Sequence, residues 1–538
     1  MKMPRKMKII VENHIPYIAG LLEPYAEVAY LDNNEITPDA VADADALVVR
    51  TRTRCNEALL LNSRCRFVAT ATIGTDHIDL NFCHAHGITV ANAPGCNAPA
   101  VAQYVLAVIA RWMDKEGLNA SQCSHLTLGI VGVGHVGSIV ARWARQLGFN
   151  VLLCDPPRAR KEGADGFADI HRIAAEAHII TFHTPFTCEG EDATFHLCDE
   201  ALIDEMKHCK LLINSARGGI VDNIALADAL ECRKIGDAAI DCWENEPHID
   251  SRLLNLAFVA TPHIAGYSAE GKRRATAMTV EALNAHFGFN AAVPPVAAPA
   301  LGAGNVSLKR IAASYNPIAD TAMLRRSADN IAEAFESLRN HYHLRHEVPE
   351  GRICVFGASS DRIDDSYKAD AMRLGELLAS AGMHCVNGAG REGVMRAVTD
   401  GVLKGGGVAI GVIPQFMVDN GWNYNRLSET IVTADMAERK RLMTDSCDAV
   451  VALPGGCGTL EELLEIITRR QLGLFCGDII ILNTGGFFRP LIEMLHRCIS
   501  ENFMRSSHRA LWFVANSPEE VMQRLLQKPE IQFIESKY

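Results

Sequence analysis

The sequence lacks the marks of secreted, membrane-bound and nucleic-acid-binding proteins. Its 17 cysteines include no CxxC pair, so we expect reduced thiols and a cytoplasmic protein rather than disulfides or zinc. The basic N-terminus runs into polar residues and no later segment is long and apolar enough to span a membrane, so we predict neither a signal peptide nor an anchor. A net charge of −12 without a long Lys/Arg run argues against nucleic acid and membranes as partners.

A metal-ligand pattern is also lacking. His341, His343 and His346 lie close together, but no cysteine or carboxylate stands at ligand spacing, so we interpret them as part of a solvated helix and predict no metal site. What the sequence does have is length. At about 100 to 200 residues per domain, 538 residues indicate three to five units with separate cores. We therefore expect a multidomain protein that acts on small molecules.

A glycine-rich turn, GIVGVGHVG at residues 129–137, follows a predicted buried strand and leads directly into a helix. Gly132 would permit the tight turn, Gly134 would let the backbone approach a pyrophosphate, and Gly137 would let helix and strand pack closely. The next strand ends in Asp155, where an acid would hold the adenine ribose and favour NAD over NADP. A tight turn in an unrelated α/β fold is the alternative reading. The context favours a dinucleotide site.

The strand and helix patterns predict an α/β protein with doubly wound sheets. Short apolar strands alternate with helices from the start, and a further set of strands begins near Arg352. The stretch NAAVPPVAAPALGAGN is Pro-rich and uncharged, which indicates a linker. The predicted parts are a substrate domain at residues 1–97 and 265–289, an inserted NAD-binding Rossmann domain at 98–264, the linker at 290–305, a small helical segment at 306–347 and a second Rossmann-like domain at 350–538.

Three polar residues in the first half each follow a predicted strand: Arg217, Glu246 and His263. Ligands of open α/β sheets bind beyond the carboxyl ends of the strands. Oxidising a hydroxyl beside a carboxylate needs a base, a group that orients the base, and a cation for the carboxylate. We predict that His263 is the base, Glu246 its partner and Arg217 the cation.

Motifs along residues 1–347 resemble the erythronate-4-phosphate dehydrogenase branch of the D-isomer-specific 2-hydroxyacid dehydrogenases. They are ATATIGTDHID, NAPGCNA, GIVGVGHVG, LLCDPPR, FHTP, INSARGGIVDN, DCWENEP and HIAGY. The resemblance implies an NAD-dependent oxidation of 4-phospho-D-erythronate to 2-oxo-3-hydroxy-4-phosphobutanoate, an early step towards pyridoxal phosphate. One departure is Gln103, where the family usually has Glu.

The resemblance also implies the fold of a two-domain 2-hydroxyacid dehydrogenase and a set of contact residues. Arg217, Glu246 and His263 would be catalytic. Substrate would contact Thr51, Thr72 and Tyr267. The cofactor contacts would be Gly132, Gly134, Val136, Gly137, Asp155, Thr184, Asp241 and Gly266.

The helical segment resembles the family's dimerisation region. Because it is too small for a core of its own, we expect a homodimer or higher homo-oligomer, with a two-fold interface formed by Leu324, Phe335, Leu338 and Tyr342. Arg345 would then reach the active site of the partner and meet the substrate phosphate. Three alternating arginines, Arg50, Arg52 and Arg54, could also bind that phosphate. That they are ordinary solvated surface charges is an equal alternative.

The second half has its own site signature in AVVALPGGCGTLEELLEIITRRQLG. This pattern predicts a buried strand, a glycine loop and a helix that opens at Thr459. Gly455, Gly456 and Gly458 would leave backbone N–H groups free for a phosphate, to which the helix dipole adds. Glu462 would lie in the first turn, where complementing the helix dipole is its alternative role.

This half resembles the Lonely Guy family of nucleoside 5′-monophosphate phosphoribohydrolases, often labelled lysine decarboxylases, through PGGCGTLEE and MAERK. The resemblance implies that Arg439 and Glu462 are catalytic, and that the protein is a bifunctional fusion. The loop residues that would bind the nucleotide phosphate are Gly455, Gly456, Gly458 and Thr459. Departures at VFGASS and NGAGREGVM leave the base open, so cytokinin riboside monophosphate and ordinary nucleotides such as AMP both remain.

Two readings from other classes stay open. Relatives of the first half include corepressors that use NAD binding as a switch, which the intact Arg217, Glu246 and His263 argue against. The other reading is a different D-2-hydroxyacid dehydrogenase whose C-terminal half is a non-catalytic nucleotide sensor. A sensor would bind a nucleotide tightly without releasing its base.

Overall fold

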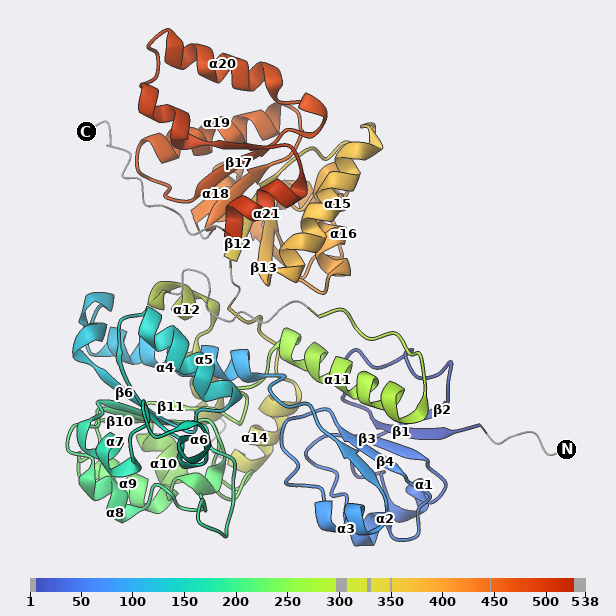
Figure 1. Cartoon of the computed structure of the whole chain (residues 1–538), viewed down its shortest axis with the longest axis vertical. Coiled ribbons are helices and arrows are strands. Elements are labelled where there is room, and N and C mark those ends of the chain that lie inside the picture. Colours follow the sequence, from blue (N-terminus) through green and yellow to red (C-terminus); the bar gives the residue numbers. More distant parts are fainter. Residues whose placement is uncertain (1–5, 297–306, 327–329, 349–350, 446, 527–538) are drawn as a thin grey trace, which may run out of the picture. The chain divides into compact units, whose positions relative to one another are not determined.

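The computed structural model describes residues 6–296, 307–326, 330–348, 351–445 and 447–526. The chain forms two compact units (Figure 1): unit 1 is Met1–Pro294 with Asn305–Val348, and unit 2 is Pro295–Gly304 with Pro349–Tyr538. Their three parallel sheets confirm the predicted α/β class. Much of the predicted linker at 290–305 lies outside the described residues. Within them, no helix has the length and apolar character needed to cross a bilayer.

The first sheet of unit 1 is parallel and has the order β2-β1-β3-β4-β5. Its central strands read as unbroken apolar runs, such as ALVV in β3, because both faces of a parallel sheet are covered. Its strands are β1 (Lys8–Glu12), β2 (Glu27–Leu31), β3 (Ala46–Val49), β4 (Phe67–Thr70) and β5 (Thr89–Ala91). The short helices α1 (Pro38–Val41), α2 (Glu57–Leu60) and α3 (Leu80–Ala85) connect them.

A long helix, α11 (Ala269–Phe287), returns from the second sheet and packs on the first. Ser268 caps its N-terminus by accepting from Gly271, and Gly288 ends it in the left-handed conformation that glycine favours. Its buried Ala275, Val280 and Leu283 share a core with strands β1, β3 and β4.

The second sheet of unit 1 is also parallel, in the order β11-β10-β9-β8-β6-β7. Its strands are β6 (Thr127–Val131), β7 (Asn150–Cys154), β8 (Ile179–Phe182), β9 (Leu211–Asn214), β10 (Asp237–Ile240) and β11 (Val259–Ala260). Helices cover it on both faces (Figure 1). They are α4 (Ala98–Lys115), α5 (His135–Gln146), α6 (Pro156–Glu162), α7 (Ile170–Glu176), α8 (Glu200–Glu205), α9 (Asn223–Glu231) and α10 (Ser251–Leu256).

The helical segment packs on its own chain, which corrects the predicted dimer contacts. It comprises α12 (Leu308–Ser314), α13 (Pro317–Arg326) and α14 (Ile331–Asn340). Leu324 and Phe335 are fully buried in the core of the second sheet, and Leu338 packs against the same core. The Tyr342 hydroxyl faces Asp320 of α13. Leu324 and Phe335 therefore have no surface left for a subunit interface, whereas the half-buried Leu338 and Tyr342 stay predicted interface residues, and self-association stays a prediction.

Arg345 is buried within unit 1 and does not project toward a partner, so its predicted role in a second active site is wrong. Its guanidinium donates to the carbonyls of Ala100, Ile264, Ala265 and Tyr267. Its ring partner is Tyr315, 4.3 Å from Cζ to the ring centroid. Ala100 opens α4, and the other three residues precede α11, so one side chain ties both crossovers between the two sheets.

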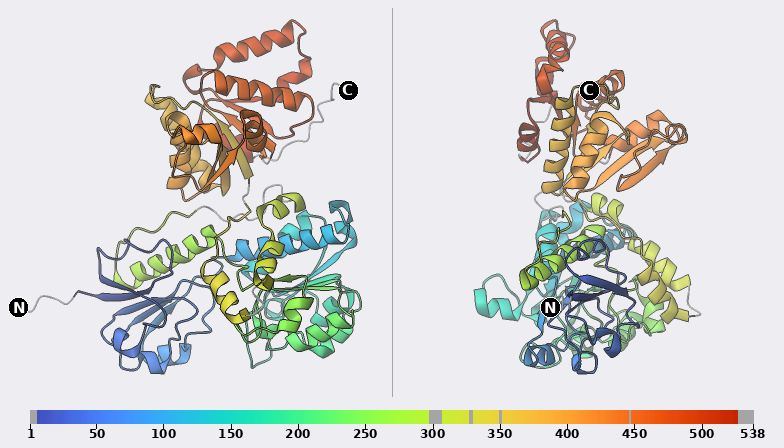
Figure 2. Two further views of the ribbon diagram at one scale, coloured as in Figure 1. Left: turned by 180° about the vertical axis from the view of Figure 1, so that it is seen from behind. Right: turned by 90° about the vertical axis from the view of Figure 1, so that its right-hand side faces the viewer.

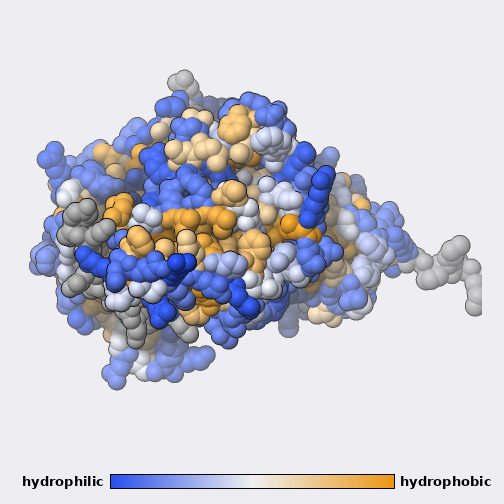
Figure 3. All heavy atoms as spheres, turned by 90° about the horizontal axis from the view of Figure 1, so that it is seen from above, coloured by the Kyte–Doolittle hydropathy of each residue, from blue (hydrophilic) through white to orange (hydrophobic). Residues whose placement is uncertain are grey.

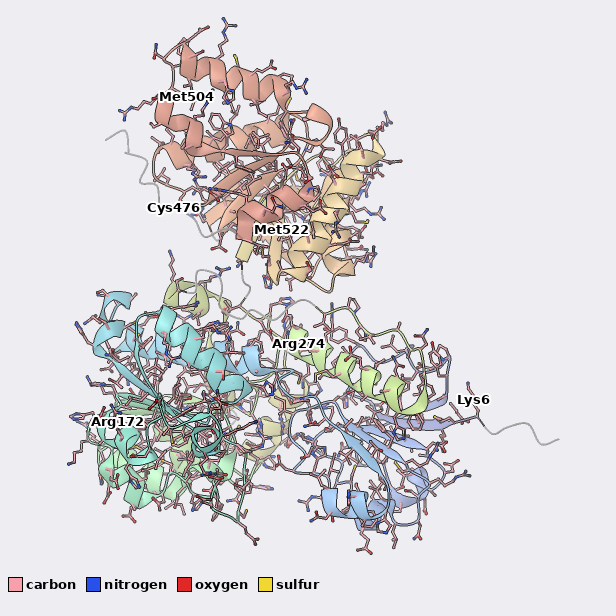
Figure 4. The ribbon with its side chains drawn as sticks, viewed as in Figure 1. Lys6, Arg172, Arg274, Cys476, Met504 and Met522 are labelled. Carbon is pink, nitrogen blue, oxygen red and sulfur yellow. The ribbon has the colours of Figure 1, made fainter. Side chains whose placement is uncertain are left out.

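Arg345 and the carbonyls that it binds form a clamp between the two sheets, and neighbouring residues add further bonds to it. Gln103 accepts from Arg345 Nε at 3.2 Å and donates to the carbonyl of His346 at 3.0 Å. His346 also bonds to Glu270 at 2.7 Å between Nδ1 and Oε1, so the predicted solvated helix is wrong at this position. Glu347 forms a buried ion pair with Arg274, which Figure 4 labels on α11.

Unit 2 holds the third parallel sheet, in the order β15-β14-β13-β12-β16-β17-β18. Its strands are β12 (Gly351–Phe356), β13 (Met383–Asn387), β14 (Ala409–Pro414), β15 (Glu429–Thr433), β16 (Ala449–Ala452), β17 (Asp478–Leu482) and β18 (Phe513–Ala515). The core on one face of the sheet includes α15 (Asp365–Ser380), α16 (Gly393–Lys404) and α21 (Pro518–Leu526). The core on the other includes α18 (Met436–Asp445), α19 (Cys457–Gln471) and α20 (Arg489–Ser500), as both views of Figure 2 show.

Unit 2 also exposes large apolar side chains near α19 and α20. Leu474 is 66% exposed, Met494 59% and Phe503 80%. The space-filling view from above shows hydrophobic residues among hydrophilic ones on the surface (Figure 3).

We predict that Arg345→Ala destabilises unit 1 by at least about 3 kcal/mol, because it leaves several buried carbonyls without a donor. Urea-dependent hydrogen exchange, which resolves unit 1 from unit 2, measures the change. The control is Arg172→Ala, because Arg172 lies on the surface of α7 (Figure 4) and forms an ion pair with Glu176 four residues on. The control should shift stability by less than about 0.5 kcal/mol. Equal stability of the two variants would contradict the clamp.

Candidate active sites

The predicted trio of unit 1 gathers at one edge of the second sheet. Arg217 follows β9, Glu246 follows β10 and His263 follows β11. These three strands are parallel neighbours, so their carboxyl ends meet at the same edge. Strand order thus places the three side chains where ligands of open α/β sheets bind.

His263 and Glu246 form a close pair. His263 Nδ1 lies 2.8 Å from Glu246 Oε2 and 3.1 Å from Oε1. The backbone N–H of Trp243 donates to Glu246 Oε1 at 2.9 Å, which fixes the carboxylate. With Nδ1 engaged, Nε2 is the ring nitrogen left to exchange a proton with a ligand.

The pKa of His263 is raised and the pKa of Glu246 is lowered in this pair. Burial lowers the pKa of His263, but the facing groups, Cys242 and Glu246, outweigh burial and hold it well above its ordinary value. Burial raises the pKa of Glu246, but the charge of His263 and the hydrogen bonds from His263 and Trp243 together outweigh burial and lower it. The pair therefore favours an imidazolium beside a carboxylate when no ligand is bound.

Arg217 is held from both sides. Its Nη1 donates to the carbonyl of Ala216 at 2.8 Å, and its Nε donates to Asp76 Oδ2 at 3.1 Å. Asp76 belongs to the loop after β4 of the first sheet, whereas Arg217 follows β9 of the second. This ion pair therefore joins the two lobes of unit 1, each of which is built on one of its two sheets. A Cβ at Gly74 would lie 2.3 Å from Arg217 Nη2. The loop thus needs glycine to approach the guanidinium.

The glycine-rich turn has the geometry of a dinucleotide cradle. Gly132 has φ +87°, and a Cβ there would lie 2.7 Å from the backbone of His183. A Cβ at Gly137 would lie 2.0 Å from the Gly132 oxygen. Gly134 caps α5 with no side chain, and a Cβ there would meet nothing within 4 Å. The helix N-terminus is therefore open to a phosphate.

Polar groups beside this turn also fit NAD. The Thr184 hydroxyl is buried and has no hydrogen-bond partner among the described residues. Asp155 follows β7 and accepts from the N–H of Val133 at 2.8 Å, which places its carboxylate against the glycine turn. Val136 lies half-buried in the first turn of α5. A ligand hydrogen-bond donor or acceptor would satisfy Thr184.

Two further predicted cofactor residues hold the loop after β11. Asp241 is buried and accepts from the N–H groups of Ile264 and Ala265 at 2.8 and 2.9 Å. Burial raises its pKa. Gly266 packs so closely on Asn97 that a Cβ would lie 2.1 Å from the amide nitrogen. Both residues fix the backbone around His263.

The predicted substrate residues of the first sheet lie at its carboxyl edge. Thr51 is exposed just after β3, and Thr72 follows β4 with its hydroxyl 2.7 Å from that of Thr70. Tyr267 lies beside His263 in sequence, and its hydroxyl accepts from Arg339 Nε at 3.1 Å.

Two cations of this region escaped the sequence analysis. Lys272 Nζ lies 3.9 Å from the centroid of the Tyr267 ring, and Arg339 bonds to the hydroxyl. Burial raises the pKa of Tyr267, but nearby positive charges, chiefly Lys272 and Arg339, outweigh burial and lower it to about 7. Lys272 stands five residues after Tyr267 and one helical turn into α11, and this spacing was the sequence signal that could have indicated a contact between them.

The three alternating arginines have different environments. Arg52 forms an ion pair with Glu336 of α14, and Arg54 is exposed. Arg50 donates from Nη1 to the carbonyl of His14 at 3.2 Å and lies 3.9 Å from Glu12. Of the three, Arg50 is close enough to Tyr267 for its charge to contribute to the lowered pKa.

Two groups of described side chains bring three potential metal donors within 4.8 Å of one another. One adds Cys242 to the His263 pair. In the other, His196 Nε2 lies 2.7 Å from Glu244 and its Nδ1 lies 3.6 Å from Asp222. Because both ring nitrogens of His196 already face carboxylates, this group reads as an ion-pair network. The expected absence of metal stays a prediction.

The site of unit 2 is built on a buried ion pair. Arg439 Nη1 donates to Glu462 Oε1 at 2.7 Å, with Arg439 7% and Glu462 11% exposed. Arg439 Nε also donates to the carbonyl of Val412 at 3.1 Å. Burial raises the pKa of Glu462, although Arg439 opposes this shift. A Cβ at Gly388 would lie 1.9 Å from the guanidinium, so only glycine fits there.

The glycine loop of unit 2 leads into α19 as predicted, but the helix begins at Cys457 instead of Thr459. Glu462 therefore lies in the second turn, which weakens the reading that it complements the helix dipole. Gly456 caps the helix without a side chain, and a Cβ on Gly456 or Gly458 would meet nothing within 4 Å. Gly455 packs against Thr459, where a Cβ would lie 2.1 Å from Oγ1.

Family models match both halves of the chain. Residues 101–265 match "D-isomer specific 2-hydroxyacid dehydrogenase, NAD binding domain", and residues 395–525 match "Possible lysine decarboxylase". These matches confirm both resemblances seen in the sequence.

Relatives of similar length exist for the first half. The chain is 43% identical over 353 residues to an erythronate-4-phosphate dehydrogenase of Bacteroides fragilis, covering 65% of this chain and 99% of that protein. It is 40% identical over 378 residues to the enzyme of that name from Yersinia enterocolitica, covering 68% and 98%. A solved D-lactate dehydrogenase from Aquifex aeolicus, complexed with NAD and lactic acid, has 25% identity and a TM-score of 0.46, covering 52% of this chain and 95% of that one.

The fold and the matched domain define unit 1 as an NAD-binding dehydrogenase of the D-isomer-specific 2-hydroxyacid class. Because the relatives are covered along nearly their whole length at 43% identity, the narrower family also follows. The chain belongs to the erythronate-4-phosphate dehydrogenase family. Unit 2 adds a domain of the second matched family.

The His263 pair predicts a pH dependence for hydroxy-acid oxidation. The base must be neutral to accept a proton, so kcat/KM should rise as pH rises through the His263 pKa, which lies above its ordinary value. Glu246→Gln removes a charge that raises this pKa, so the rise should move to lower pH and the plateau should fall. The measurement is the pH profile of kcat/KM.

The control for this experiment is Glu244→Gln, an equal chemical change in the same loop on a carboxylate that faces His196. Its midpoint should match that of the wild type. A Glu246→Gln profile with an unshifted midpoint would show that Glu246 does not set the protonation of His263.

Proposed function

We propose that unit 1 oxidises 4-phospho-D-erythronate to 2-oxo-3-hydroxy-4-phosphobutanoate with NAD. The observation that carries the proposal is the His263–Glu246 pair at 2.8 Å, placed at the same sheet edge as Arg217. Relatives named for this substrate align along 97 to 99% of their length. Pyridoxal phosphate biosynthesis is the context that the substrate implies.

Each residue of the trio has a distinct task in this reaction. Neutral His263 takes the hydroxyl proton at Nε2 while Glu246 holds Nδ1 and stabilises the imidazolium that forms. Arg217 binds the carboxylate and the nascent carbonyl oxygen, for which its planar fork suits better than an ammonium. The chemistry that NAD supplies when bound is acceptance of a hydride.

The cofactor residues divide by task. Gly132, Gly134 and Gly137 hold the pyrophosphate at the start of α5, with Val136 beside them. Asp155 binds the adenine ribose and disfavours a 2′-phosphate there. Contacts from the remaining side of the site come from Thr184, Asp241 and Gly266.

The remaining substrate contacts come from the first sheet and from the loop before α11. Thr51 and Thr72 lie at the carboxyl edge of that sheet, and Tyr267 follows His263 closely. An NAD-dependent switch is the alternative. The intact trio favours turnover, because a switch would not need a paired base.

We predict that His263→Ala lowers the rate of NADH formation from 4-phosphoerythronate by about a hundredfold to ten-thousandfold, the usual contribution of a general base. NAD affinity should change little, because His263 does not belong to the glycine turn. The increase in NADH absorbance with time measures the rate, and calorimetry measures NAD binding. Turnover near the wild-type rate would rule out His263 as the base.

For unit 2 we propose hydrolysis of the N-glycosidic bond of a nucleoside 5′-monophosphate. The observation that supports it is the buried pair of Arg439 and Glu462 beside a glycine loop that opens α19. The loop binds the phosphate, and Glu462 stabilises an oxocarbenium-like state while water attacks. Decarboxylation is disfavoured, because Lys440, the lysine beside Arg439, is already paired with Glu461 and Glu465. A nucleotide sensor is the alternative.

We predict that Glu462→Gln in the full chain sharply reduces release of free base from a nucleoside monophosphate panel while nucleotide still binds. The amide keeps the shape of the side chain but removes the charge that stabilises the transition state. His263→Ala is the matched control, since it should leave base release intact, just as Glu462→Gln should leave NADH formation intact. Tight nucleotide binding without base release by the wild type would identify a sensor instead.

A further inference from the structure

Three cationic side chains surround Tyr267 next to the His263 pair. Lys272 lies over the ring at 3.9 Å, and Arg339 donates to the hydroxyl at 3.1 Å. Arg50 approaches from the end of β3. They come from α11, α14 and the first sheet, three elements far apart in sequence. We call Arg50, Lys272 and Arg339 the cation cluster.

The cation cluster has fewer anions than cations. Among the described residues, no carboxylate lies within ion-pair distance of Lys272. Arg50 Nε lies 3.9 Å from Glu12 Oε1, and Arg339 Nη1 lies 4.0 Å from Glu246 Oε2, both at the limit of an ion pair. Glu336, also near Arg339, is engaged by Arg52. The structure therefore concentrates positive charge in a largely buried place beside the base, an arrangement that an anionic ligand would stabilise.

The cation cluster is also held in position. Glu12 is 2% exposed and accepts from the N–H of Arg50 and from the hydroxyl of Thr53. Arg339 is 13% exposed in the last turn of α14, and Lys272 lies one turn into α11. Side chains fixed on three rigid elements lose little entropy when they bind a ligand.

We propose that Lys272 and Arg339, with Arg50, bind the phosphate of the substrate and make unit 1 selective for a phosphorylated hydroxy acid. This rests on the proposed function only in taking 4-phosphoerythronate as the substrate. Arg217 binds the carboxylate end, and the cation cluster binds the phosphate end, with the reacting carbon at His263. The assignment moves the phosphate away from Arg52 and Arg54, which the sequence had also offered, and away from Arg345.

The test compares two substrates that differ only in the phosphate. Lys272→Met and Arg339→Gln should each raise KM for 4-phosphoerythronate by about tenfold to a hundredfold, the loss expected for one charge-assisted hydrogen bond. KM for unphosphorylated erythronate should stay unchanged. Lys272→Arg keeps the charge and should recover most of the affinity.

The matched control is Arg273→Met. It removes one positive charge from the next position of α11, where the guanidinium stacks on Tyr17 at 4.7 Å instead of facing Tyr267. It should leave both KM values unchanged. If Lys272→Met and Arg339→Gln weaken both substrates equally, the cluster serves the fold or the base and the proposal is overturned.

A second probe separates this proposal from the proposed function. Inorganic phosphate should bind the wild type with NAD present, as measured by calorimetry, and should bind Lys272→Met at least about tenfold more weakly. If the wild type fails to oxidise 4-phosphoerythronate but phosphate binding depends on Lys272, the proposed substrate is wrong and the cluster stands. If phosphate binds both proteins equally, the cluster is overturned whatever the substrate.

Discussion

The constraint on which unit 1 depends is the burial of one guanidinium among backbone carbonyls. Arg345 meets the carbonyl that opens α4 and those between His263 and Tyr267. A buried charge needs several oriented acceptors, and here the acceptors belong to both crossovers between the two sheets. The requirement to satisfy this charge therefore fixes the loop that carries His263. The trio and the cation cluster meet because this loop is held.

Sequence reasoning succeeded where local chemistry decides the outcome. The glycine turn and the central strands are each specified by residues that are neighbours in the sequence, and the predicted strand ends indicated where Arg217, Glu246 and His263 gather. It missed the edge strands β2, β5, β15 and β18, which are short and partly exposed and so lack the continuous apolar signal of central strands. It also misplaced the helical segment, because an apolar face does not reveal which surface will cover it. Lys272 and Arg339 gained meaning only from Tyr267, which tertiary structure brings between them.

The two units solve a similar electrostatic problem in different ways. In unit 1 the imidazole of His263 and the carboxylate of Glu246 form a hydrogen-bonded pair, and the charge of each stabilises the charge of the other. In unit 2 a permanently charged arginine holds a carboxylate whose pKa burial raises. The first arrangement suits a group that must gain and lose a proton within each cycle. The second suits a carboxylate that keeps its place while charge develops on a sugar.

The ion pair between Arg217 and Asp76 has a consequence for how the two lobes of unit 1 move. Asp76 is 59% exposed, so dissolved salt screens this bond strongly. Arg217, the residue proposed to bind the substrate carboxylate, thus also links the two sheets of unit 1 through Asp76. An arriving carboxylate competes with Asp76 for the same guanidinium, so ligand entry and lobe separation are coupled through one arginine. Ionic strength then acts on the opening of the enzyme as well as on its attraction for an anionic substrate.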